Sequence, residues 1–134
     1  MPERAELRAW RAPPAVEYVV DFETVSNLDD DFSTFPSMGG LPMIFMIGCG
    51  TLQRGVWTSF KHFTVNGLTK DEESRIVDAW LAHVRAHPDA PILHWSRAEK
   101  DMYAAARRRH GHPAAWPEEL PWRDACVTLF RHLA

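Results

Sequence analysis

The chain has few cysteines and no long apolar run, and each of these absences excludes a class of protein. It contains 2 cysteines, Cys49 and Cys126, among 134 residues, which is too few for a disulfide-stapled domain or for a zinc site built from cysteines. The longest apolar run, residues 41–49, is interrupted by Pro42 and Gly48. A membrane-spanning helix needs roughly 18 apolar residues in succession, so the sequence predicts no membrane partner.

Positive charge is not in excess either, because the formal net charge is −3. The chain therefore lacks the strong positive field of a non-specific nucleic-acid binder. An enzyme that holds nucleic acid through metal ions is not excluded by this balance. Residues 1–15 alternate charges and lack the apolar core of a signal peptide. We treat them as a peripheral N-terminal segment and expect a cytoplasmic protein.

The chain is 46% hydrophobic and 25% charged, which is typical of one folded domain, here residues 16–134. Runs of β-branched and aromatic residues predict strands, and apolar residues repeating every three or four positions predict helices. These patterns indicate strands over 17–22, 43–49 and 56–63, a helix over 70–86, a strand over 91–94, a helix over 96–110, a short strand over 122–124 and a last helix over 125–133. Three antiparallel strands followed by alternating strands and helices predict an α/β fold, in which helices flank a mixed sheet.

A pair of carboxylates, Asp21 and Glu23, comes at the end of the first predicted strand. Residues at i and i+2 of a strand point to the same face, so the two carboxylates repel each other unless a cation lies between them. Oxygen ligands of this kind suit Mg²⁺ or Mn²⁺. The pattern is short, and a strand that simply ends here, with Glu23 in solvent, explains it as well.

A second acidic residue follows the strand over 91–94, where a helix begins. The segment from His94 to Lys100 reads HWSRAEK and places Glu99 in the first helical turn. Ser96 and Glu99 have the spacing of a capping box, in which the glutamate stabilises the start of the helix. A structural cap and a metal ligand are therefore competing explanations for Glu99.

Together, and in this order of elements, the two features resemble the DEDD superfamily of 3′–5′ exonucleases. The first motif of that family, Asp-x-Glu on the first strand, is matched by Asp21 and Glu23, and Glu99 falls at the acidic position of its second motif. The sequence around His94 is most similar to that of predicted ribonuclease-H-like nucleases of bacteria and phages. The resemblance covers roughly residues 16–131. Asp124 falls where the family has an aspartate that is usually structural.

The resemblance implies a ribonuclease-H-like fold and a metal-dependent nuclease of the 3′–5′ exonuclease type, as used in nucleic-acid repair and processing. Its partner would be the end of a single-stranded DNA or RNA. Asp21, Glu23 and Glu99 would be both the catalytic residues and the ligands of two Mg²⁺ or Mn²⁺ ions. The residues that the resemblance assigns to substrate binding are Thr24, His94 and Trp95.

One part of the family pattern is missing, namely the helix that carries a His or Tyr base and a fourth acidic residue. The sequence stops at Ala134, before that motif, so we expect a C-terminally incomplete piece of a longer polypeptide. Without the base and one ligand, this chain alone is expected to bind Mg²⁺ or Mn²⁺ weakly and to cleave poorly or not at all. The alternative is a catalytically inactive ribonuclease-H-like module that binds nucleic acid or a partner protein.

Three further patterns are typical of helix ends rather than of functional sites. Thr69 and Glu72 have the spacing of a capping box at the start of the helix over 70–86. His110 and His112 are metal-ligand types, but they coincide with the end of the next helix. The basic run over 107–109 complements the dipole of the same helix, and we expect it to be solvated.

Overall fold

The computed structural model of the chain describes residues 14–25, 43–95 and 97–125. The elements in these ranges are β1 (Val16–Val25), β2 (Met43–Gln53), β3 (Val56–Thr64), α2 (Lys70–Val84), β4 (Ile92–His94), α3 (Arg97–Arg109) and β5 (Trp122–Asp124). The predicted strands and helices in these ranges are all present, with ends shifted by a few residues. The predictions for residues 1–13, for Ser96 and for the helix after Ala125 lie outside the described residues.

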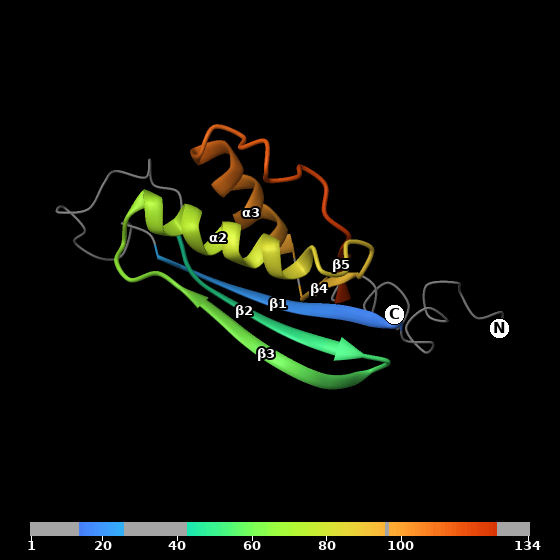
Figure 1. The fold of residues 1–134 in the computed structure, drawn as a ribbon. Coiled ribbons are helices and arrows are strands. Elements are labelled where there is room, and N and C mark those ends of the chain that lie inside the picture. The colour runs from blue at the N-terminus through green and yellow to red at the C-terminus, as the bar shows by residue number, and fades with distance from the viewer. Residues whose placement is uncertain (1–13, 26–42, 96, 126–134) are drawn as a thin grey trace, which may run out of the picture.

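The strands form one mixed sheet in the order β3-β2-β1-β4-β5 (Figure 1). β1 and β3 are each antiparallel to β2, whereas β4 is parallel to both β1 and β5. The hairpin between β2 and β3 turns at Arg54 and Gly55, whose φ angles are 50° and 80°, because a two-residue type I′ turn requires positive φ at both positions. The α/β class, the mixed sheet and its first three antiparallel strands are therefore confirmed.

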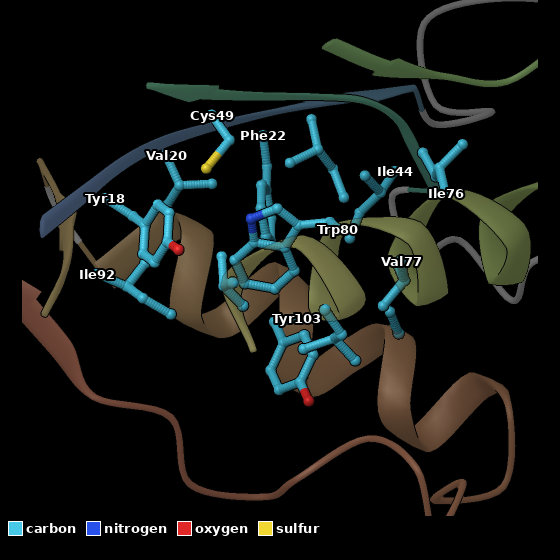
Figure 2. Packing of buried hydrophobic residues seen from close by; sticks show 14 of the residues in the cluster. Tyr18, Val20, Phe22, Ile44, Cys49, Ile76, Val77, Trp80, Ile92 and Tyr103 are labelled. Carbon is cyan, nitrogen blue, oxygen red and sulfur yellow. The ribbon is translucent and has the colours of Figure 1, made fainter. Parts of the chain in front are cut away.

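Both helices lie on the same side of the sheet (Figure 1), and the core fills the space between them and β1. The alternation of β1 directs Tyr18 and Phe22 into this space, where both are buried. Trp80 of α2 lies at the centre, with ring centroids 5.1 Å from Phe22 and 6.1 Å from Tyr103 of α3. Figure 2 shows Trp80 between the residues of β1 and Tyr103. In the described part of the chain, neither helix has the length and apolar character needed to cross a membrane.

The start of α2 is capped, but not by the complete capping box that the sequence predicts. The Thr69 hydroxyl accepts a hydrogen bond from the Glu72 amide at 3.2 Å, as expected. The Glu72 carboxylate instead accepts from the Asn66 amide at 2.8 Å and from Arg75 Nε at 2.5 Å, while the Thr69 amide donates to Gly67. The reciprocal half of the predicted box is therefore wrong, because a turn just before the helix offers the carboxylate a different amide.

A buried ion pair joins the start of α2 to the end of α3. Glu73 is fully buried, and its carboxylate accepts hydrogen bonds from Arg109 at 3.0 and 2.6 Å and from the Ile44 amide at 2.7 Å. His110 Nε2 lies 2.8 Å from the same carboxylate. Glu73 precedes Trp80 by seven positions and so lies on the buried face of α2. That spacing is the sequence signal that could have identified it.

The expectation that the basic run over 107–109 is solvated is therefore wrong for Arg109, which is 7% exposed. Arg107 Nε donates to the Trp116 carbonyl oxygen at 3.0 Å, and only Arg108 of the three is exposed. His110 is engaged by Glu73, whereas His112 is exposed with a φ of 52° after the helix. The two histidines thus belong to the helix end, as the sequence favours.

His83 makes the stability of the fold sensitive to acid. Its ring packs between Tyr18 and Phe63, with centroids 5.5 and 5.8 Å away, and its Nε2 is buried without a hydrogen-bond partner among the described residues. Burial, and to a lesser degree the charge of Lys61, lower the pKa of His83 below 6.5. Its neutral form is therefore favoured by the fold, and stability is lost as the pH falls below about 6.5.

We accordingly expect His83→Phe to flatten the pH dependence of unfolding. Phenylalanine keeps the ring contacts but takes up no proton, so the variant gains stability relative to the parent chain as the pH falls from 7 to 5. Urea unfolding of both proteins across this range measures the difference. If the free energy of unfolding changed equally with pH in the two proteins, a buried, neutral His83 would be contradicted.

Candidate active site

Asp21 and Glu23 lie in the second half of β1, on the face of the sheet opposite to the helices. The residues that flank Asp21 point into the core, whereas Asp21 and Glu23 are both exposed. The shared face expected from their spacing is therefore observed. The pairing with β2 shifts directly after Glu23, because Phe45 of β2 has no partner between Glu23 and Thr24, and such β-bulges are frequent next to active sites.

The parallel pairing of β1, β4 and β5 brings the carboxyl ends of these strands to one edge of the sheet. Val19 lies opposite Leu93, and His94 lies opposite Asp124. α3 begins soon after β4, so Glu99 in its first turn lies at the same edge. Ligands of open α/β sheets bind outside the carboxyl ends of the strands, so this edge is the natural place for a site.

Glu99 is the most unusual residue at this edge. It is 8% exposed, and its Oε2 is buried without a hydrogen-bond partner among the described residues. Burial raises the pKa of Glu99, and the charges of Asp21 and Asp124 raise it further, while its own backbone amide and His94 act in the opposite direction. The carboxylates of Asp21 and Asp124 are thus within electrostatic range of Glu99. Glu23 does not contribute to the shift in the pKa of Glu99.

The three residues assigned to substrate binding differ in their access to solvent. Trp95 is 59% exposed directly after β4, so its ring is free to contact a ligand. His94 is 4% exposed and packs edge-on against Trp122, with ring centroids 5.4 Å apart, so it lies in the interior rather than on the surface. Thr24 is half-buried beyond the bulge. The sequence-based role of each in substrate binding stays a prediction.

The donor set suits a hard divalent cation. Carboxylate oxygens are the ligands that Mg²⁺ and Mn²⁺ prefer, and a cation would compensate the buried, unpartnered oxygen of Glu99 beside Asp21 and Asp124. Within residues 14–25, 43–95 and 97–125, however, no three His, Cys, Asp or Glu side chains are already grouped to hold a metal ion. The residue chemistry therefore fits Mg²⁺ or Mn²⁺, but the ligands are not pre-assembled.

Comparison with known proteins assigns no family to this chain. No protein-family model matches it, and no curated protein does so either. The resemblance to the DEDD exonucleases therefore depends on the motifs at Asp21, Glu23 and Glu99 and on the order of the elements.

Proposed function

We propose that this chain is a metal-dependent nuclease domain of ribonuclease-H-like fold, which hydrolyses nucleic-acid phosphodiesters in the manner of a 3′–5′ exonuclease. The observation that carries the proposal is the buried Glu99 carboxylate, with one oxygen unpartnered and the charge of Asp21 in range. A buried acid arranged in this way lowers stability, and such arrangements cluster at functional sites. Three antiparallel strands followed by parallel strands and helices support the proposed fold.

In this proposal Asp21, Glu23 and Glu99 hold Mg²⁺ or Mn²⁺, which would neutralise the charge of the phosphate and lower the pKa of a bound water. A site made of carboxylates alone suffices because phosphodiester hydrolysis depends on alignment and charge stabilisation more than on a covalent nucleophile. His94 would favour the ionised form of Glu99 that binds a cation, because a positive charge on its ring lowers the pKa of that carboxyl. Trp95 contacts the substrate at the rim of the site.

The metal site is tested by the thermal stability of Glu99→Gln, which does not require activity. Without metal, we expect this variant to have a higher Tm than the parent chain at pH 7, because the fold disfavours the charged form of Glu99. The unfolded state ionises Glu99 at its ordinary pKa, so the advantage of the variant disappears as the pH falls to about 4. Addition of MnCl₂ should raise the Tm of the parent chain and leave that of the variant unchanged.

Glu118→Gln is the matched control, because Glu118 is an exposed acid in the connector that follows α3. This change should alter neither the Tm nor its response to Mn²⁺. A parent chain whose Tm does not respond to Mn²⁺ at millimolar concentrations would contradict the metal site. A response that survives in Glu99→Gln would place the cation elsewhere.

A second candidate function is a non-catalytic ribonuclease-H-like module that binds nucleic acid or a partner protein. The observation that favours it is the lack, within the described ranges, of three side chains grouped to hold a metal ion. The two candidates differ in their response to Mn²⁺, because only the nuclease needs the cation. Binding that is equal with Mn²⁺ and with EDTA, without cleavage, would favour the module.

A further inference from the structure

The face of the sheet opposite to the helices carries exposed aromatic side chains on β3. Trp57 is 60% exposed and Phe60 is 58% exposed, and the ring of His62 packs edge-on against Phe60 with centroids 4.6 Å apart. We call Trp57, Phe60 and His62 the aromatic face. Soluble proteins rarely leave such rings grouped in solvent unless the surface binds something.

The rings of Trp57 and Phe60 pack against the sheet over two glycines of β2. A Cβ atom at Gly50 would lie only 2.0 Å from Cζ3 of Trp57, and one at Gly48 would lie 3.2 Å from Cζ of Phe60. Glycine weakens a strand interior and marks places where another group approaches the backbone closely. Here the approaching groups are the two rings, which cover the strand backbone and leave their outer surfaces open.

The aromatic face continues into the candidate active site. Asp21 lies opposite Gly48, and Gly48 lies opposite His62, so the three residues cross neighbouring strands on one face. The Cβ position at Gly48 that Phe60 approaches is also 3.8 Å from the carbonyl oxygen of Asp21. Because strands lie about 4.8 Å apart, the rings begin about one strand away from the first carboxylate.

We propose that the aromatic face binds the unpaired bases of a single-stranded nucleic acid and leads that strand to Asp21. This inference rests on the proposed function and adds to it the surface that would hold the unpaired strand. Aromatic rings with one open side stack on any unpaired base, whereas the bases of a duplex are already stacked on each other. Arg54 in the hairpin turn is exposed and supplies positive charge beside the phosphates.

The test measures binding of a fluorescein-labelled oligo(dT) by anisotropy, at low salt and in EDTA, so that neither cleavage nor a metal ion is required. Trp57→Ala and Phe60→Ala should each weaken binding about 5- to 100-fold, the effect expected for loss of one stacking ring. A duplex of equal length should bind less tightly than the single strand. The matched control is Val56→Ala, because Val56 is 64% exposed on the same strand but points to the other face of the sheet; its Kd should stay within about 2-fold.

Circular dichroism shows whether each variant is folded, and Trp57→Phe, which keeps a stacking ring, should retain most of the affinity. The inference is overturned if oligo(dT) does not bind the parent chain or binds the Trp57→Ala, Phe60→Ala double variant equally well. It is also overturned if sedimentation shows that the parent chain is a dimer and the double variant a monomer, since the rings would then form a self-association surface.

Cleavage and binding assays distinguish the failure of this inference from the failure of the proposed function. If the ring variants lose no affinity for oligo(dT) but cleavage by a longer polypeptide containing this chain depends on Asp21, only this inference is contradicted. If the rings are needed for binding but that longer polypeptide does not cleave with Mn²⁺, only the nuclease is contradicted.

Discussion

Asp21→Asn should lower Mn²⁺-dependent cleavage of a single-stranded oligonucleotide by roughly 10²- to 10⁴-fold. Asparagine keeps the size of the side chain and its place on β1 but removes the charge that attracts the cation. Since Asp21 is exposed, the fold should tolerate the change. The measurement is the initial rate of degradation of a labelled strand, in the 134-residue chain or in a longer polypeptide that contains it, compared in the same background.

Asp89→Asn serves as the control for this prediction. Asp89 is exposed and lies beside Pro14 and Val16, at the amino end of β1 and therefore away from the carboxyl ends of the strands. Its replacement should leave the rate unchanged. If Asp21→Asn cleaves as fast as the parent protein, Asp21 is not a ligand in the reaction, and the nuclease proposal loses its central residue.

Glu73→Gln should destabilise the fold by about 3–5 kcal/mol, because it removes one charge from a buried pair and leaves Arg109 buried without compensation. The glutamine can still accept from the Ile44 amide, so the loss reports mainly on the charge. For a domain of this size the Tm should fall by at least about 10 °C. Urea unfolding followed by tryptophan fluorescence measures the free energy directly.

The neighbouring change Glu72→Gln provides a comparison within the same helix. Glu72 also pairs with an arginine, Arg75, but the side chain of Arg75 is 48% exposed, and ion pairs in solvent contribute little to stability. We expect a far smaller loss than in Glu73→Gln. Similar losses in the two variants would show that burial does not decide the strength of these pairs.

The local features of the candidate site follow from short stretches of sequence. The alternation of apolar and polar residues in β1 places Asp21 and Glu23 together on one face, because successive side chains of any strand point to opposite faces. The turn at Arg54 and Gly55 and the start of α2 at Thr69 depend on neighbouring residues in the same way. Each of these could be predicted, since every interaction spans only a few positions.

The capping explanation of Glu99 shows where such local reasoning stops. A glutamate three residues after a serine predicts a cap equally well whether its carboxylate lies in solvent or in the interior. Its burial, its unpartnered oxygen and its proximity to Asp21 and Asp124 arise from the pairing of β1, β4 and β5. Residues far apart in the sequence create that environment, so the pattern around Glu99 does not contain it.

The sequence by itself determined the order of strands and helices, the antiparallel start of the sheet and the shared face of Asp21 and Glu23. Only the tertiary structure decided that Glu99 is buried at the edge near Asp21 and that Arg109 forms a buried ion pair with Glu73. It also decided which rings of β3 remain exposed to solvent. The physical reason is the distance along the chain over which each effect acts. Dihedral preferences and hydrophobic periodicity act over a few residues, whereas burial and charge depend on every element that packs around a group.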